Sequence, residues 1–276
     1  MSERVDLALR VGIFIAVFVP LLAAERRWPL RIAPAARCKR MRDNLGLFFS
    51  GVACVRLLPL SGVGFAFLAQ QQSLGLFNHL HLRLSIAFIA TLALLDAAVY
   101  FQHRLMHRWP ALWRLHRVHH SDRFLDASSA LRFHPAEIVL SALYKGALIV
   151  LLGAPPVAVL CFEALLNASA MFNHSNLALA PRVDRMLRAV LVTPAMHWIH
   201  HSIRPHESRR NFGFCLSWWD RLFGSYQEAP QDGYDAMHVG VEHLEEDAPG
   251  VLSLLAQPTR DVPAPEAGSY VPGGTA

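Results

Sequence analysis

The sequence predicts an all-α integral membrane protein of about four to five apolar helices, with a cytosolic, histidine-rich helical cap. Three observations support this fold class. The 276 residues are 53% hydrophobic and 17% charged, with a mean hydropathy of +0.28, whereas soluble domains carry about 25% charged residues. Several apolar runs approach the roughly 20 residues that cross a bilayer. Most of the 15 histidines fall in one third of the chain.

Three apolar runs in the first part of the chain are candidate membrane spans. They cover residues 7–24, 45–69 and 84–101, and Arg56, Pro59 and glycines interrupt the second. Each run is close to the length that crosses hydrocarbon. A cleaved signal peptide is disfavoured for the first run, because its basic residues follow the apolar stretch instead of preceding it.

Two further runs predict a helical hairpin. They cover residues 138–153 and 156–172 and meet at Ala154-Pro155-Pro156, where proline stops one helix and can start the next. The chain is therefore expected to have two or three N-terminal spans plus the two arms of the hairpin.

The domain organisation is simple. From about Leu244 the chain is rich in proline, glycine, alanine and acidic residues, which predicts a flexible tail over 244–276 with a short helix near Leu252. We therefore expect a single domain over residues 1–243, with its histidine-rich catalytic region at about 96–226.

The charge distribution predicts the orientation in the membrane. Residues 26–42 contain seven basic side chains, whereas the loop at 70–83 contains one, so the first loop is expected in the cytoplasm. The third run then returns to the cytoplasm, and all the histidine clusters face it. The excess of arginine over lysine favours a bacterial inner membrane. A net charge of +5 is too small to indicate a nucleic-acid partner.

Eight histidines fall into three closely spaced groups. His103 and His107 stand at i and i+4 in one helical pattern, where both can reach one ion. The other two groups both read H-x-x-H-H and contain His116, His119 and His120, and His197, His200 and His201. Positions i, i+3 and i+4 project to one side of a helix, so we expect each motif to offer three nitrogen donors to a single centre. Eight ligands are too many for one ion, so the spacing predicts two metals.

Three other polar residues are candidates for the same site. His134, in Arg-Phe-His-Pro, and His174, in Phe-Asn-His-Ser-Asn, are placed to complete the ligand set. Asp96 precedes His103 by seven residues and shares its helical face. Its carboxylate could accept the second N–H of a ligand histidine, or it could form hydrogen bonds within the helix bundle, and the sequence leaves both interpretations open.

The ligand type narrows the chemistry. Imidazole suits zinc, copper, iron and nickel, and four widely spaced cysteines argue against an iron–sulfur or thiolate zinc site. Zinc-protease and nucleotide-binding motifs are missing from the sequence, so an electron source must be a separate partner. The alternative function is a membrane metal transporter or metal-binding protein, which would place its ligands near the bilayer midplane on several helices.

The order and spacing of these motifs resemble the sterol desaturase / fatty acid hydroxylase superfamily of membrane di-iron oxygenases. The resemblance covers residues 96–226 and rests on HRLMH, LWRLHRVHHSD, SSALRFHPAE, FNHSN, VTPAMHWIHHS and NFGFCLSWWDRLFGSY. By position, the ligand roles of the family fall on His103, His107, His116, His119, His120, His197, His200 and His201, and they extend to His134 and His174.

The resemblance also implies an activity. It implies two iron ions, O2 as co-substrate, an external electron donor of the cytochrome or ferredoxin/reductase type, and hydroxylation or desaturation of a lipid drawn from the bilayer. Both reactions begin with the same hydrogen abstraction, so the ligand set does not separate them. One departure is visible, because Arg209 and Arg210 stand where relatives usually carry an acidic residue.

Overall fold

The computed structural model describes residues 3–58, 61–242, 244 and 249–261. Within these ranges the chain is helical, with isolated β-bridges and no strand. The helices are α1 (Glu3–Arg27), α2 (Arg37–Leu57), α3 (Gly62–Gln71), α4 (Leu76–His79), α5 (Leu84–Arg108), α6 (Pro110–His120), η1 (Ala127–Leu131), α7 (Pro135–Leu152), α8 (Pro156–His174), α9 (Pro181–Arg188), α10 (Pro194–His200), α11 (Pro205–Ser208), α12 (Trp218–Leu222), α13 (Gly233–Ala236), α14 (Val251–Ala256) and η2 (Gln257–Thr259).

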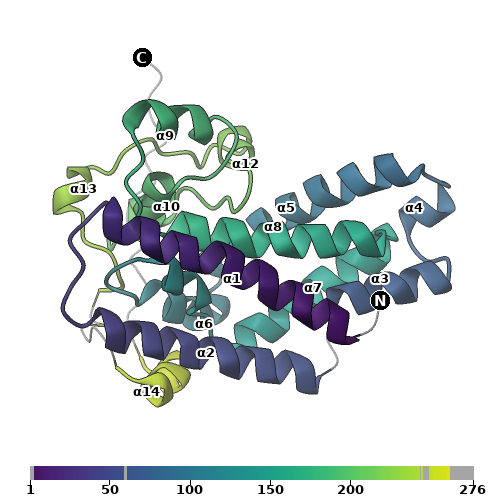
Figure 1. The fold of residues 1–276 in the computed structure, drawn as a ribbon, viewed down its shortest axis with the longest axis horizontal. Coiled ribbons are helices and arrows are strands. Elements are labelled where there is room, and N and C mark those ends of the chain that lie inside the picture. Colours follow the sequence, from purple (N-terminus) through teal and green to yellow (C-terminus); the bar gives the residue numbers. More distant parts are fainter. Residues whose placement is uncertain (1–2, 59–60, 243, 245–248, 262–276) are drawn as a thin grey trace.

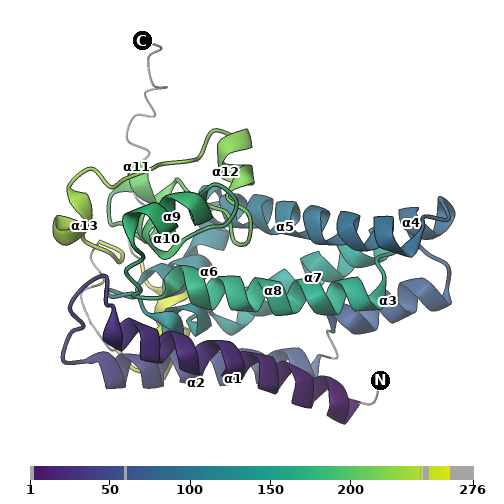
Figure 2. The ribbon, with the colours of Figure 1, turned by 45° about the horizontal axis from the view of Figure 1, so that its top comes forward.

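The long helices form a bundle with a cap at one end. Helices α1, α2, α5, α7 and α8 run along the long axis of the molecule, and the short helices α9 to α13 gather at one end of it (Figures 1 and 2). Five stretches of the described chain are long and apolar enough to cross a membrane. The predicted all-α membrane fold is therefore confirmed. The second predicted run, 45–69, is divided between α2 and α3, and its Pro59 lies outside the described residues.

The predicted hairpin is formed by α7 and α8. Gly153 ends α7 in the left-handed conformation, with φ of 69°, and Pro156 occupies the first turn of α8. Gly75 packs against this turn so closely that a Cβ atom there would lie 2.1 Å from the backbone nitrogen of Gly153. A side chain at residue 75 would therefore force the α3–α4 connection away from the hairpin.

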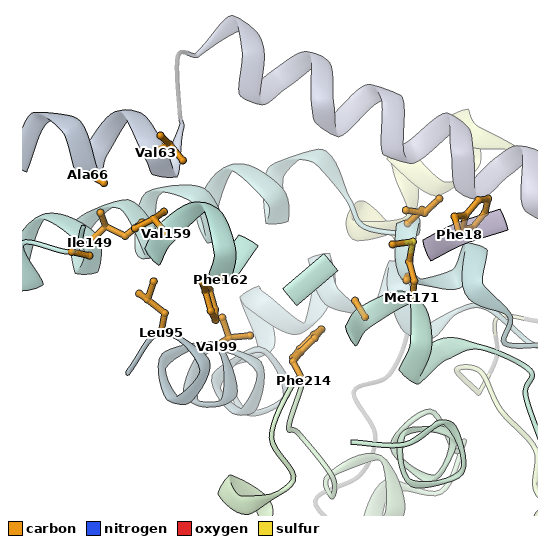
Figure 3. Close-up of a cluster of buried hydrophobic side chains, with 14 of the residues drawn as sticks. Phe18, Val63, Ala66, Leu95, Val99, Ile149, Val159, Phe162, Met171 and Phe214 are labelled. Carbon is orange, nitrogen blue, oxygen red and sulfur yellow. The ribbon is translucent and has the colours of Figure 1, made fainter. Parts of the chain in front are cut away.

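A buried apolar cluster joins the bundle to the cap (Figure 3). Leu95 and Val99 of α5 face Phe162 of α8, and Phe214 of the cap belongs to the same cluster. Lipid tails are as apolar as these side chains, so close packing and van der Waals contact hold the helices together within a bilayer. Phe214 thus fixes the position of the segment that follows α11 relative to the ends of α5 and α8.

The last described segment packs against the bundle. Val251 of α14 lies over Gly46 of α2, and the carbonyl of Gln257 accepts a hydrogen bond of 2.7 Å from Arg117 of α6. Residues 249–261 belong to the stretch that composition assigned to a tail, yet here they cover α2 and α6. The rest of that stretch, 262–276, lies outside the described residues.

Candidate metal centre

Nine histidines converge in two groups at the cap end of the bundle. Group A contains His103, His107, His116, His120 and His200, and group B contains His119, His174, His197 and His201. Within each group, one nitrogen of every ring lies within 4.8 Å of the others. Two nitrogen ligands on opposite sides of one ion are separated by about 4.2 Å, given metal–nitrogen bonds of about 2.0–2.1 Å. Each group therefore has the dimensions of a single metal site.

Each H-x-x-H-H motif serves both groups, which corrects the expectation that each would supply one centre. His116 and His120 join group A while His119 joins group B. The second motif divides in the opposite sense, because His197 and His201 join group B while His200 joins group A. At about 100° per residue, positions i+3 and i+4 lie on opposite sides of i around the helix, so they can face two different centres, and the packing of the neighbouring helices decides which centre each histidine joins.

Group B is centred on His174. Its Nε2 lies 3.0 Å from Nε2 of His119, 3.1 Å from Nε2 of His197 and 3.2 Å from Nε2 of His201. The Nδ1–H of His174 donates to the carbonyl of Ala170 at 2.7 Å, so its Nε2 carries a single lone pair. Three rings cannot all donate to that lone pair, whereas one cation accepts all four. The spacing is close to the roughly 3.3 Å between ligands of a tetrahedral ion.

Hydrogen-bond acceptors on the Nδ1 side of the rings orient three histidines of group A. The Nδ1–H donors of three of its rings are held by the carbonyl of Phe212 for His103 (2.8 Å), the carboxylate of Glu137 for His116 (2.7 Å) and the carbonyl of Arg210 for His200 (2.8 Å). The Nε2 atoms of these three rings are buried and have no hydrogen-bond partner among the described residues. Such second-side hydrogen bonds are typical of metal ligands, because they fix the tautomer and the ring orientation. The donor set therefore fits a metal ion.

A buried ionic network holds the segment after α6. Arg40 of α2 donates to Asp122 at 2.6 Å and also contacts Asp126, and Ser129 donates to Asp122 at 2.6 Å. Asp122 follows His120 by two residues, so this network fixes the end of α6 against α2. On the same segment, the ring of Phe133 stacks on the ring of His119, with centroids 4.3 Å apart. Contacts with α2 and with Phe133 thus set the positions of His119 and His120.

Burial keeps the cap imidazoles neutral. It lowers the pKa of His200 to about 3, and burial followed by the neighbouring imidazoles lowers the pKa values of His119, His120, His197 and His201 well below the ordinary range. Neutral imidazole is the form that binds metal. The folded protein therefore presents lone pairs at neutral pH.

Two predicted site residues lie elsewhere. His134 joins neither group: its Nδ1 accepts the N–H of Ala136 at the start of α7, and its Nε2 contacts the carbonyl of Leu255 at 3.2 Å. It therefore caps a helix, the role open to any acceptor side chain directly before a helix. His134 is therefore not one of the proposed metal ligands.

Asp96 contacts no ligand histidine and takes the other of its two expected roles. Its carboxylate accepts hydrogen bonds from the backbone of Cys215 (3.2 Å) and Leu216 (3.1 Å) and from Nε1 of Trp219 (2.8 Å). It thereby anchors the segment after Phe214 to α5. Cys215 lies in this segment, and burial raises the pKa of its thiol, which makes the thiol a poor metal ligand.

The sequence interpretation did not single out Glu137 or the backbone acceptors. Glu137 had one usable signal: an acidic residue in the first turn of an apolar helix, three residues after a histidine, is unusual. The carbonyls of Phe212 and Arg210 had none, because every residue carries a carbonyl. Arg210 contributes its backbone at the position where an acidic side chain was expected.

The metal centre lies inside the part of the chain that known proteins share. The sequence model of the fatty acid hydroxylase family matches residues 88–225, half of the chain. The chain is 32% identical to ornithine lipid hydroxylase OlsE of Rhizobium tropici, over 63% of this chain and 51% of that protein. It is 31% identical to the alkylglycerol monooxygenase of Danio rerio, over 60% of this chain and 36% of that protein.

A third relative has a different activity in its name. The chain is 26% identical to the Delta(7)-sterol 5(6)-desaturase of Eremothecium gossypii, over 56% of this chain and 42% of that protein. The chain thus spans about half or less of the length of these relatives. No solved structure matches it with significance.

Proposed function

We propose, from the premise that this chain belongs to the fatty acid hydroxylase family, that it is a membrane-bound di-iron oxygenase. It would use O2 and electrons from a separate donor protein to hydroxylate or desaturate one C–H position of a lipid. The observation that carries this proposal is the convergence of nine imidazoles into two adjacent groups, each of the size of one ion, at one end of a membrane bundle.

The ligand set favours iron. Group A offers five imidazoles and group B four, and neither contains a cysteine, so soft thiolate-binding metals are disfavoured. Two structural zinc ions would not need nine ligands, because zinc takes four. When bound, a pair of irons supplies the redox chemistry that activates O2 and removes hydrogen from an unactivated carbon. We assign the nine histidines of groups A and B as its ligands.

The residues of the chain would hold, orient and shield this centre. Glu137 and the carbonyls of Phe212 and Arg210 keep three rings of group A turned with Nε2 inward. Eight of the nine rings are buried, and His107 is the one that is partly exposed. A dry surrounding favours neutral imidazole and keeps water from intercepting a reactive oxidant.

Lipid is the substrate class that the relatives support. Their names refer to an ornithine lipid, an alkylglycerol and a sterol, which share long apolar parts and differ in their polar groups. The metal groups lie at the ends of α5 and α8, which are candidate membrane spans. A lipid held between the helices could therefore bring a carbon to the centre without leaving the bilayer. The transporter alternative would need ligands along the middle of the spans, whereas the two histidine groups lie at the cap end of the bundle.

The cap would face the cytoplasm of a bacterium. The arginine-rich connection between α1 and α2 lies at the cap end, since Arg37 and Arg40 contact Asp126 in the segment after α6. The positive-inside rule places such a connection in the cytoplasm. Soluble electron carriers of the cytochrome or ferredoxin type would reach the cap from this side.

Metal content is the first test. The full chain is purified in detergent, reconstituted with Fe2+ without oxygen, and analysed for metals. We expect two irons per chain, one in His174→Ala or His200→Ala, and two in His206→Ala, which alters an exposed histidine outside both groups. Zinc retained in preference to iron, or the same metal content in all variants, would contradict the assignment.

Activity is the second test. The iron-loaded chain in nanodiscs made from bacterial lipid extract receives 18O2 and a chemical reductant, and the lipids are analysed by mass spectrometry. A lipid that carries 18O identifies a hydroxylase, and a lipid that has lost two hydrogens without 18O identifies a desaturase. Unchanged lipids with an iron-loaded enzyme would contradict the oxygenase proposal for these substrates.

A further inference from the structure

A short helix of the cap exposes a group of large apolar side chains. Trp218, Leu222 and Phe223, in and directly after α12, are 50%, 69% and 38% exposed, and the turn after α9 adds Val190 (44%) and Leu191 (39%). We call these five side chains the α12 face. Apolar groups of this kind on a protein surface mark sites that another apolar body covers.

The α12 face is built rigidly. Nε1 of Trp218 donates to the carbonyl of Ala189 at 2.9 Å, and Ser217 donates through Oγ to the carbonyl of Arg188 at 2.7 Å. These hydrogen bonds tie the start of α12 to the end of α9. The apolar side chains are therefore held outward by the fold and do not result from a loose loop.

The α12 face continues an exposed apolar stripe of α5. The ring centroid of Phe223 lies 4.8 Å from that of Phe101, and Figure 2 shows α12 beside the cap end of α5. Phe101, Leu105 and Trp109 are exposed at intervals of four residues, which places them in one stripe along the end of α5. Because α5 is a candidate membrane span, a lipid that covered this stripe would also reach the α12 face.

A basic hollow adjoins the α12 face. It has a volume of about 560 Å³, lies between α9, α12 and the segment after α12, and is lined by Arg185, Arg188 and Arg221. Arg188 is paired with Asp184. The guanidinium of Arg221 lies 3.8 Å from the ring centroid of Tyr226. Within the described ranges, Arg185 and Arg221 form no ion pair with a carboxylate.

The charge of the hollow favours an anion. Its three arginines face two carboxylates, those of Asp184 and Glu228, so a positive charge remains. Guanidinium groups bind phosphate through two parallel hydrogen bonds. An anion-binding hollow beside exposed apolar and aromatic side chains matches the headgroup region of a bilayer, where lipid phosphates lie next to apolar chains.

We propose that the α12 face lies in the headgroup region of the leaflet that borders the cap, and that Arg185 and Arg221 bind the phosphate of an anionic phospholipid there. The bound lipid would be a fixed contact between cap and membrane, separate from any substrate. The proposal does not depend on the proposed function, because it concerns surface residues that touch no ligand histidine.

Photo-crosslinking tests the membrane contact. p-Benzoylphenylalanine replaces Leu222 in the full chain, which is placed in nanodiscs that contain phosphatidylglycerol and phosphatidylcholine and is irradiated. The matched control places the same residue at Ala236, which is exposed on α13 at another part of the cap. We expect lipid adducts at position 222 and none at position 236. Adducts to a second copy of the chain at position 222, or equal lipid labelling at both positions, would overturn the proposal.

Lipid titration tests the hollow. The thermal midpoint of the detergent-solubilised chain is followed against phosphatidylglycerol, phosphatidylcholine and inorganic phosphate. We expect stabilisation by phosphatidylglycerol alone, with binding about thirtyfold weaker in Arg185→Gln/Arg221→Gln, because each arginine near an anionic lipid surface contributes a factor of roughly five and the two factors multiply. Arg114→Gln, which alters an exposed arginine of α6, should match the wild-type chain.

Each other outcome of the titration counts against the proposal. Equal stabilisation by inorganic phosphate would show an anion site without lipid specificity. Unchanged phosphatidylglycerol binding in the double variant would place the lipid elsewhere. A double variant that unfolds before titration is replaced by Arg221→Lys, which keeps the charge but loses the paired hydrogen bonds, so that weakened binding is still expected.

Discussion

The carboxylate of Glu137 should control the affinity of one metal position and leave the other unchanged. It accepts the Nδ1–H of His116 at 2.7 Å, and both side chains are buried. Replacing it by leucine leaves a buried N–H without an acceptor, which costs about 1–3 kcal/mol. Loss of such an outer acceptor typically weakens metal binding about 10–100-fold. In Glu137→Gln the amide oxygen can still accept, so the loss should be closer to about fivefold, because the charge-assisted part of the bond is gone.

The assay exploits the division into two groups. Chains loaded with Fe2+ are titrated without oxygen against a chelator of known affinity, and the iron that remains per chain is measured. His116 belongs to group A, whereas group B is centred on His174, whose Nδ1 is held by the carbonyl of Ala170. We expect one iron of Glu137→Leu to leave at lower chelator concentration, while the second iron leaves as in the wild-type chain.

A matched variant controls for loss of a buried acid. Glu207 is buried in the cap, accepts the backbone N–H of Gln231 at 2.6 Å and contacts no ligand histidine. Glu207→Gln should therefore retain both irons with wild-type affinity. If both irons of Glu137→Leu weaken equally, or neither weakens, the link from Glu137 through His116 to one metal position is refuted.

Three other perturbations test the remaining parts of the site. In the metal-free chain, the pKa of His200 is lowered to about 3 from its usual 6.5, so below about pH 6.5 the unfolded state binds a proton that the folded state does not. The stabilisation by a neutral buried histidine is thus fully present above pH 6.5 and decreases as the pH falls, by up to about 1.4 kcal/mol per pH unit for each such histidine. The thermal midpoint of His200→Gln should therefore fall less between pH 7 and pH 5 than that of the wild-type chain. Equal falls would contradict the view that His200 is buried in its neutral form. Burial raises the pKa of Asp220 from 3.8 to about 6, and this carboxylate accepts the N–H of Phe212 at 2.7 Å. Between about pH 6 and pH 4 the folded wild-type chain therefore binds a proton that the unfolded chain does not, so its stability rises as the pH falls. Asp220→Asn removes this titration, so the loss of stability that it causes should be smaller at pH 8 than at pH 5, and a pH-independent loss would argue against this role. His134→Ala should keep both irons and lose about 1 kcal/mol of stability with its helix cap; loss of one iron would return His134 to the ligand set.

The sequence alone determined that the chain forms membrane helices and that histidines bind its metals. Composition and run length sufficed for the membrane helices, because a bilayer imposes a length and an apolar character on any helix that crosses it. The turn at Ala154-Pro155-Pro156 was legible because proline and glycine act locally on the backbone. Together with His103 and His107, the repeated H-x-x-H-H pattern indicated two metals because eight imidazoles are too many ligands for one ion. These inferences need only neighbouring residues along the chain.

Only the tertiary structure decided how the ligands are shared and which groups support them. His119 leaves the group of His116 and His120 because a second helix presents His197 and His201 on that side, and this meeting depends on how α6, α8 and α10 pack. Asp96 lies on the face of His103 but binds the segment at 215–219, since that segment folds over α5. The carbonyls that orient the rings of His103 and His200 are chemically identical in every residue, so position in space alone distinguishes them.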